Sequence, residues 1–194
     1  MKELGNKSLD ELPALTTLSL LGNPLKSIEN AWSPKLRWLD VSDCLLNYLN
    51  PDTFNGFPEL EELRLVNNPT LVYSTRRLTL RHEKLRRLDV SRCNLDRPGL
   101  HGLPSLTHAR LSRNTIRLLP DRIFAKNRQL AYLYLNSNGV ERLNAGAFEG
   151  LVKLQVLDLS ANGFENIHPL AFHENIDLRL LNLSHNTLYE FPNL

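Results

Sequence analysis

Leucines recur along this chain in one fixed phrase. The phrase reads leucine, two residues, leucine, one residue, leucine, two residues, asparagine, as in Leu154–Asn162. It begins eight times, at positions 15, 36, 60, 85, 106, 130, 154 and 178, in steps of 21 to 25 residues. A repeat of this length is one small structural unit that buries its apolar face only by stacking on its neighbours. The sequence therefore predicts a stacked solenoid, with residues 1–194 as one domain.

The leucines of each phrase alternate with polar residues, which is the pattern of a strand with one buried face. Leu157 and Leu159 are expected to point inward and Asp158 outward. Successive strands are separated by enough chain for a crossover, so they can pair in parallel. We predict an α/β solenoid in the form of a curved horseshoe. Its concave face would be a parallel sheet of about eight strands, and its convex side irregular or 3-10 structure.

Two further residue types mark the repeat. The asparagine after the strand both donates and accepts hydrogen bonds, so it is expected to satisfy buried backbone groups of the turn and of the neighbouring repeat. A phenylalanine eighteen residues after the first leucine is expected to fill the coil behind the sheet in four repeats, at Phe54, Phe124, Phe148 and Phe172. Repeat three departs from this pattern. Its interval Asn68–Leu71 is one residue longer and Leu78 stands at the phenylalanine position, which predicts a bulge on the convex side.

The two cysteines, Cys44 and Cys93, occupy the asparagine position of repeats two and four. Two strand spacings, roughly 9–10 Å, should separate them. A disulfide needs Cα atoms within about 7 Å, so no bridge is expected between them. We interpret them as buried thiols with weak hydrogen bonds. A reactive or metal-binding role is the alternative.

Outward strand positions should form columns along the solenoid. One column alternates in sign through Asp40, Arg64, Asp89 and Arg110, and is expected to be largely paired within itself. Exposed pairs of this kind contribute about 0–1 kcal/mol each.

Arginine is in excess across repeats four and five. Arg86 and four further arginines should face only Asp89, beside one histidine and two tyrosines. Arginine and tyrosine are enriched at protein–protein hot spots, and an outward tryptophan is a separate candidate anchor. A solvated face without a partner and a site for a polyanion are the alternatives to a protein-binding patch. The predicted partner-binding residues are Trp38, Arg64, Arg87, Arg92, His108, Arg110, Arg113, Tyr132 and Tyr134.

The residues Leu130–Asn138 and Ala147–Leu154 resemble the typical leucine-rich repeats of animal extracellular proteins. That class includes Toll-like receptors, Slit, and neuronal and insect cell-surface proteins. The resemblance runs from Leu15 to the end of the chain. It implies a horseshoe fold, ligand recognition by the concave face or its flank, and no catalysis. The cysteine-rich caps of complete members are not present, so we expect an excerpt of a longer ectodomain whose signal sequence and any membrane anchor lie outside this chain.

Composition excludes several other functions. The net charge of +2 does not argue for a nucleic-acid partner, and no apolar run is long enough to cross a bilayer. The six histidines show no metal-ligand spacing, and no phosphate-binding loop, nucleophile elbow or zinc-protease motif occurs. We therefore expect no enzyme activity, no cofactor and no metal. Asn6 and Asn182 begin glycosylation sequons and are candidate glycosylation sites.

The sequence favours an extracellular or cell-surface recognition module with a protein ligand or co-receptor. It would be part of a receptor, an adhesion protein or a secreted protein, and a sulfated glycan is a lesser alternative as ligand. An intracellular scaffold or adaptor is a second hypothesis, since two unpaired cysteines and the lack of a leader fit it. A structural spacer without a ligand is the third. The oligomeric state stays open.

Overall fold

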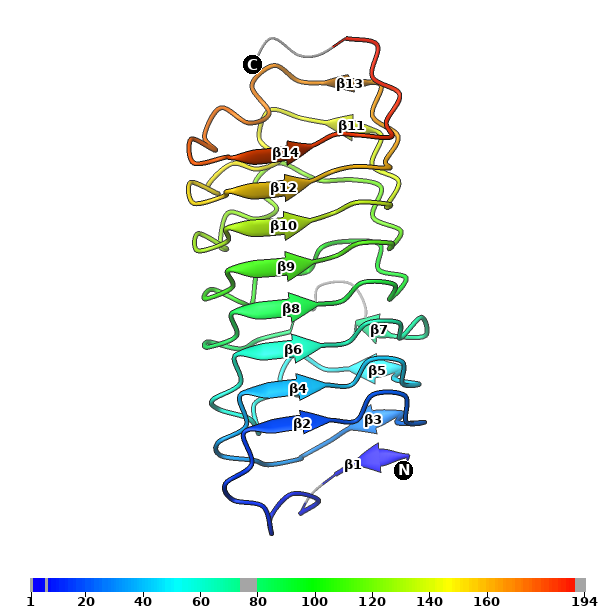
Figure 1. Ribbon diagram of the computed structural model, residues 1–194, viewed down its shortest axis with the longest axis vertical. Helices are drawn as coiled ribbons and strands as arrows, with labels where there is room; N and C mark the ends of the chain where they lie inside the picture. Colours follow the sequence, from blue (N-terminus) through cyan, green and yellow to red (C-terminus); the bar gives the residue numbers. More distant parts are fainter. Residues whose placement is uncertain (1, 6, 74–79, 191–194) are drawn as a thin grey trace.

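The structure is a computed structural model that describes residues 2–5, 7–73 and 80–190. The chain winds into coils stacked along one long axis, with the N-terminal coil at one end and the C-terminal coil at the other (Figure 1). Each coil contributes one strand to a common sheet. Leu78 and Asn6 lie outside the described residues, and the two expectations that rest on them stay predictions.

The main sheet has eight strands, all parallel, in the order β14-β12-β10-β9-β8-β6-β4-β2. The central residue of each strand turns inward, and six of these residues, from Leu39 to Leu157, are fully buried. The predicted parallel sheet of about eight strands is confirmed. Its strands are β2 (Thr17–Ser19), β4 (Trp38–Asp40), β6 (Glu62–Arg64), β8 (Arg87–Asp89), β9 (His108–Arg110), β10 (Tyr132–Tyr134), β12 (Val156–Asp158) and β14 (Leu180–Asn182).

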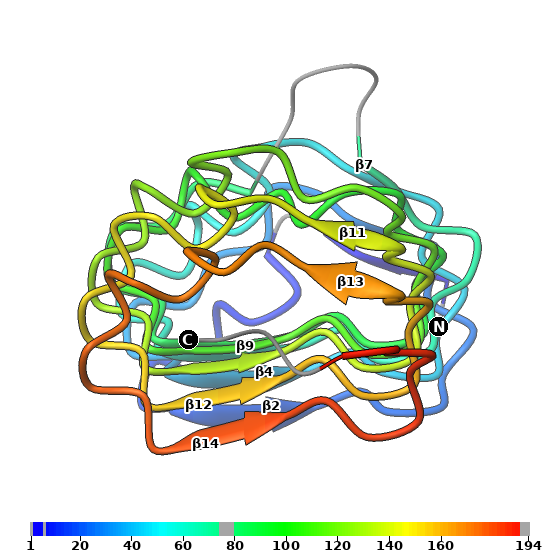
Figure 2. The same cartoon turned by 90° about the horizontal axis from the view of Figure 1, so that it is seen from above.

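The opposite side of each coil is made of turns and two-residue strands (Figure 2). No helical segment occurs in the described part of the chain, so this side takes the irregular form that the repeat pattern predicts. Three short parallel pairs, which the sequence did not reveal, join adjacent coils there. They are β1 (Glu3–Leu4) with β3 (Ser27–Ile28), β5 (Tyr48–Leu49) with β7 (Val72–Tyr73), and β11 (Arg142–Leu143) with β13 (Asn166–Ile167).

Phenylalanines fill the coil behind the sheet, as the repeat predicts. The rings of Phe124 and Phe148 have centroids 6.0 Å apart with an interplanar angle of 8°, and those of Phe148 and Phe172 are 5.9 Å apart at 12°. Phe54 instead packs against Phe57, with a centroid distance of 6.4 Å. Such aromatic pairs contribute about 0.5–1.5 kcal/mol beyond the area they bury. The stack therefore joins consecutive coils on the side away from the sheet.

Asparagine side chains join consecutive coils where the chain leaves the sheet. The Asn162 amide nitrogen donates to the carbonyls of Leu135 and Leu159 at 3.1 and 2.9 Å. Its oxygen accepts from the backbone N–H groups of Asn138, Gly139 and Val140 at 3.0–3.2 Å. Equivalent bonds are made by Asn68, Asn114, Asn138 and Asn186.

Cys44 and Cys93 interrupt this ladder and are free, buried thiols. The Cys93 thiol donates to the Leu65 carbonyl at 3.1 Å, and the Cys44 thiol donates to Leu20 at 3.4 Å. Sulfur is a weak acceptor, so these residues supply only the donor half of the asparagine role. Burial raises the pKa of Cys93 to about 11, which keeps it a thiol at neutral pH. That favours the structural interpretation over a reactive thiolate.

A strained turn follows each strand of the sheet. The third residue after the strand has a positive φ in every coil, between 50° and 58° for the seven that are not glycine. A left-handed backbone costs about 1–2 kcal/mol for a residue with a side chain. The conformation allows its N–H to donate to the next coil, as Ala161 does to the Ser184 carbonyl at 2.9 Å. The column reads Gly22, Asp43, Asn67, Arg92, Arg113, Ser137, Ala161 and His185.

A second set of buried polar side chains lies on the side of the coil that returns to the sheet, three residues before the first leucine of a repeat. Asn127 donates to the carbonyls of Leu100 and Leu103 at 2.8 and 3.0 Å. His82 Nε2 lies 3.0 Å from the Phe57 carbonyl, which only accepts, so this nitrogen carries the proton. Burial lowers the pKa of His82. Its Nδ1 is buried and has no hydrogen-bond partner, so a second ring proton would also be unpaired.

Replacing Gly56 by alanine should disrupt the stacking of two coils. An added Cβ would lie 1.9 Å from the carbonyl oxygen of Ala31, which is backbone and cannot rotate away. We expect Gly56→Ala to lower the free energy of unfolding by about 3 kcal/mol, the upper range for overpacking. At Gly163 the nearest atom would be 3.4 Å away, so Gly163→Ala is the matched control. Equal stability of the two variants in urea unfolding would contradict the expected clash.

Relieving one strained turn should stabilise the protein. Ala161 is exposed and has a φ of 51°, a conformation that glycine adopts without a steric penalty. Ala161→Gly should raise the free energy of unfolding by about 0.5 kcal/mol, because relief of strain exceeds the entropic cost of glycine. Ala131→Gly, before strand β10, should lower it by about 0.5–1 kcal/mol. Thermal unfolding of both variants checks the difference in sign.

His82→Asn should weaken the loss of stability in acid. Because the folded-state pKa of His82 is depressed, the unfolded chain takes up the proton first as pH falls below about 6.5. The stabilisation is therefore complete above that pH and is lost below it. Asparagine keeps the donor to the preceding carbonyls, as Asn127 does, and does not titrate. A melting temperature that falls as steeply in the variant as in the parent between pH 7 and pH 5 would contradict this role.

Candidate functional site

The outward residues of the main sheet lie side by side in columns. In the column nearest the strand starts, Trp38 is in register with Glu62, and Glu62 with Arg87. His108 and Tyr132 continue the same column on β9 and β10. The next outward column carries Arg64, Asp89, Arg110 and Tyr134 in the same way. The placement of these residues agrees with the repeat pattern, while their part in binding stays a prediction.

Rings and guanidinium groups contact one another across adjacent strands. The His108 and Tyr132 rings stack with centroids 4.2 Å apart at an interplanar angle of 10°. The Arg110 guanidinium lies 4.9 Å from the centre of the Tyr134 ring, and that of Arg64 lies 5.8 Å from the Trp38 ring. Exposed cation–π contacts contribute about 0.5–1 kcal/mol. They hold these long side chains in defined positions on the face.

The expectation that the alternating charges would pair with one another is wrong. Among the described residues, no ion pair joins two members of that column. The Asp89 carboxylate instead accepts from the Ser91 N–H at 3.1 Å and its hydroxyl at 2.7 Å. Asp158 does the same with Ser160. A short aspartate side chain reaches its own turn more easily than a neighbouring strand, and the arginines lie over aromatic rings.

Glu62 is the central carboxylate of the face. It accepts from Arg64 Nε at 3.1 Å and from Arg87 Nη1 at 3.5 Å. The expectation that the arginine group faces only Asp89 is therefore wrong, because Arg87 is paired with Glu62. Beside it, Arg37 pairs with Glu61 at 3.0 Å. These partly exposed pairs are screened by water and fix side-chain orientation more than they stabilise the fold.

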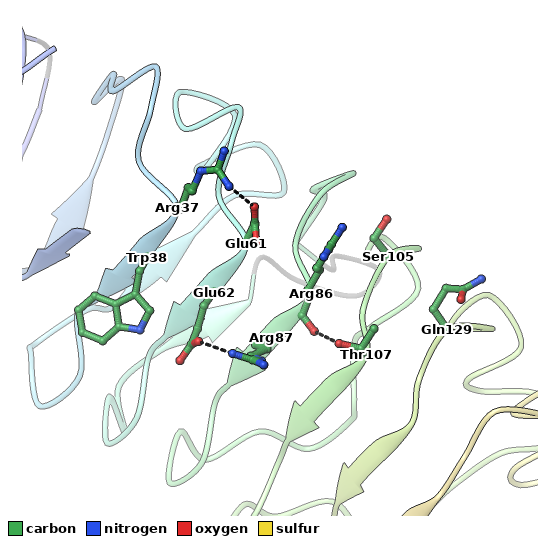
Figure 3. A pocket seen from close by; sticks show the side chains of 9 residues that line it. All are labelled: Arg37, Trp38, Glu61, Glu62, Arg86, Arg87, Ser105, Thr107 and Gln129. Atoms are coloured by element: carbon green, nitrogen blue, oxygen red, sulfur yellow. Dashed lines mark hydrogen bonds and ion pairs between the residues drawn. The ribbon is translucent and has the colours of Figure 1, made fainter. Parts of the chain in front are cut away.

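Two shallow grooves meet at Glu62 and Arg87. The first, of about 540 Å³, follows the edge where the strands begin (Figure 3). The second, of about 390 Å³, runs over the middle of the same strands and includes Arg64, Asp89, His108 and Arg110. The first is lined by Arg37, Trp38, Glu61, Glu62, Arg86, Arg87, Ser105, Thr107 and Gln129.

His108 is oriented by its neighbour Thr107. The Thr107 hydroxyl donates its one proton to the Arg86 carbonyl at 2.9 Å. The contact of 2.9 Å between that hydroxyl oxygen and His108 Nδ1 is therefore donated by the ring, and Nε2 is the acceptor of the neutral imidazole. Burial lowers the pKa of His108, and the positive charges of Arg87 and Arg110 lower it further.

The structure brings seven of the nine predicted binding residues together. Trp38 and Arg87 line the first groove, Arg64, Arg87, His108 and Arg110 the second, and Tyr132 and Tyr134 contact the last two of these from β10. Arg92 and Arg113 are set apart on the strained turns.

Glu62 was missed as a site residue. Its position between Trp38 and Arg87 in one column was a signal that could have identified it. Thr107 carried no such signal, because its contact with His108 depends on side-chain orientation.

Other parts of the described chain give less support for a functional site. The Asn182 side-chain oxygen accepts from the Ser184 N–H at 3.1 Å and from its hydroxyl at 2.8 Å, and glycosylation there stays a prediction. Within the described ranges, no group of three or more metal-binding side chains is assembled. No helix in these ranges has the length and hydropathy to cross a membrane.

Comparisons with known proteins agree with this geometry. The crystal structure of the TLR13–ssRNA13 complex superimposes on the chain with a TM-score of 0.58 and 24% sequence identity. The match covers 97% of this chain and 38% of the solved one, so this chain spans well under half of that receptor structure. At this identity the likeness shows the fold alone. Comparison with curated proteins finds no match.

The family described as Leucine rich repeat matches residues 13–70 and 104–164. These two segments include six of the eight phrases and make up more than half of the chain. The asparagine ladder, the parallel sheet and the repeated leucines are the physical basis of that match. The chain belongs to the leucine-rich-repeat family.

Proposed function

We propose that this protein recognises another protein through the concave face of its sheet and the adjoining turns. The observation that carries the proposal is the set of aromatic and arginine side chains joined across β9 and β10. Arg110 lies over Tyr134, and His108 stacks on Tyr132. Arginine and tyrosine dominate binding energy at interfaces when their position is fixed before binding. The proposed binding residues are Trp38, Arg64, Arg87, Arg92, His108, Arg110, Arg113, Tyr132 and Tyr134.

A protein partner suits this face better than a nucleic acid. The solved relative was crystallised with single-stranded RNA, but that ligand does not transfer at 24% identity. Here Glu61 and Glu62 pair with Arg37, Arg64 and Arg87, so the face offers no continuous run of free positive charge to a phosphate backbone. The rings of His108 and Tyr132 cover each other, which leaves little free ring surface for stacked bases. A mixed face with localised charge is the usual character of a protein interface.

We propose an extracellular or cell-surface setting, with the chain as one domain of a longer ectodomain. The repeats resemble those of extracellular receptors, and the structural neighbour is a receptor. An intracellular adaptor is the second candidate, because Cys44 and Cys93 are free thiols. Immunostaining of intact cells that express the full-length protein separates the two settings. Use of Asn182 as a glycosylation site would support the extracellular one.

Reversing two charges on the face should weaken binding. The probe is an array of purified extracellular domains together with an equal set of cytoplasmic proteins. Arg87→Glu combined with Arg110→Glu should weaken binding to any partner found by at least about tenfold, the loss of about 1.4 kcal/mol. The matched control, Arg117→Glu with Arg142→Glu, changes two exposed arginines that line neither groove of the face.

The outcomes separate the hypotheses. Unchanged affinity in the Arg87 and Arg110 double variant, measured by surface plasmon resonance, would exclude this patch. Partners found only among cytoplasmic proteins would favour the adaptor. A chain that binds nothing in either set would favour a structural spacer.

A further inference from the structure

Four arginines in repeats four and five have no carboxylate partner. Arg86, Arg92, Arg110 and Arg113 are all exposed, and none of them forms an ion pair with a described residue. Arg110 has only its contact with the Tyr134 ring. Arg92 and Arg113 occupy equivalent turns of adjacent coils, so two like charges stand about one strand spacing, ~4.8 Å, apart at the backbone.

The nearby carboxylates are already engaged. Asp89 accepts two hydrogen bonds from Ser91, Glu62 holds Arg64 and Arg87, and Glu61 holds Arg37. The four arginines therefore keep their charge unneutralised by contact.

The four arginines form a track that runs along the strands. Arg86 precedes β8 and is level with Thr107, because Arg87 is in register with His108. Arg110 lies three residues further along, at the end of β9, and Arg113 three residues beyond that, level with Arg92. At ~3.3 Å per residue, the levels of Arg86 and Arg110 are roughly 10 Å apart at the backbone, and the level of Arg92 and Arg113 lies past the strands, on the turns.

The two sides of the arginine track carry different side chains. On the β6 side Glu61 and Glu62 are paired with Arg37, Arg64 and Arg87, so this border adds little charge of its own to the track. On the β10 side stand the uncharged Tyr132, Tyr134 and Ser137. Asp89, in register with Arg110, adds one negative charge inside the track. A continuous polyanion would meet this charge, whereas separated carboxylates can avoid it.

We propose that the track binds an acidic segment of a partner protein in the polyproline II conformation, with carboxylates three residues apart at positions i, i+3 and i+6, lying parallel to β8 and β9. This rests on the proposed function and specifies the chemistry of its partner. Three residues of this conformation make one turn and span roughly 9 Å, so every third side chain returns to the same face at about the spacing of the first two levels of the track. In a helix the same three residues rise only about 4.5 Å. Arginine pairs with a carboxylate through two parallel hydrogen bonds, which favours discrete acidic residues.

The test uses the full chain and two synthetic peptides of equal composition. One nine-residue peptide of serine and glycine carries glutamate at positions 2, 5 and 8, and its isomer carries the three glutamates at positions 4, 5 and 6. Each has a fluorophore at its N-terminus, and binding is measured by fluorescence anisotropy at low ionic strength. The spaced peptide should bind at least about fivefold more tightly, because the isomer cannot place its carboxylates at all three levels.

Single substitutions define the track. Arg86→Gln, Arg110→Gln and Arg113→Gln should each weaken binding of the spaced peptide by about two- to fivefold, as expected for one exposed charge pair. Arg142→Gln, which removes an exposed arginine from the convex strand β11, should leave it unchanged. Unchanged circular dichroism and melting temperature of each variant confirm that the fold is kept.

Four results would overturn the proposal. Equal affinity for the two isomers, or an equal loss in Arg142→Gln, would show general attraction to positive charge. A heparin tetrasaccharide that binds more tightly than the spaced peptide, with the same dependence on these arginines, would show a polyanion site. A protein partner from the array that binds the Arg86 and Arg113 variants normally would preserve the proposed function and reject the track. Binding of the spaced peptide through these arginines, with no partner on the array, would support the track and reject the wider function.

Discussion

The hydrogen bonds of the asparagine column are the constraint on which the coil depends. Each strand of the sheet is only three residues long, so the ladder between strands gives each coil few backbone bonds. The chain must then turn sharply with several N–H and C=O groups inside the solenoid. The Asn162 amide satisfies two carbonyls and three N–H groups of that turn. A buried group left without a partner costs about 1–3 kcal/mol, so no apolar residue of the same size could replace it.

The same bonds explain why the protein tolerates strained backbone in every coil. Arg92, Arg113 and Ala161 have left-handed conformations although each carries a side chain. Their N–H groups donate to carbonyls of the following coil, and the next residue, asparagine or its cysteine equivalent, closes the turn. Cys93 supplies the donor of this arrangement but not the acceptor. The turns that involve the two cysteines therefore have fewer cross-coil bonds than those that involve asparagine.

The fold is stabilised by backbone hydrogen bonds and buried leucines. The outward side chains contribute little to it and can therefore vary. Along β4 to β10 they include tryptophan, arginine, histidine and tyrosine in one contiguous surface. Asp89 and Asp158 are exceptions, since their carboxylates close their own turns. That use of the acidic residues leaves arginine charge uncompensated on β8 and β9. The positive charge of the face thus follows from the hydrogen bonds that the aspartates make within their own turns.

The repeated phrase by itself determined the parallel sheet, its register, the inward leucines, the stacked phenylalanines and the asparagine ladder. These features depend on period and residue type, and each recurs with every coil. It also determined which residues share a column, and so placed His108 beside Tyr132. Only the tertiary structure decided that Arg110 lies over Tyr134, that Asp89 bonds to Ser91, and that Glu62 takes both Arg64 and Arg87. Such contacts depend on the rotamers of long side chains, each of which has several possible partners at similar distances. A repeat pattern does not specify which rotamer is adopted.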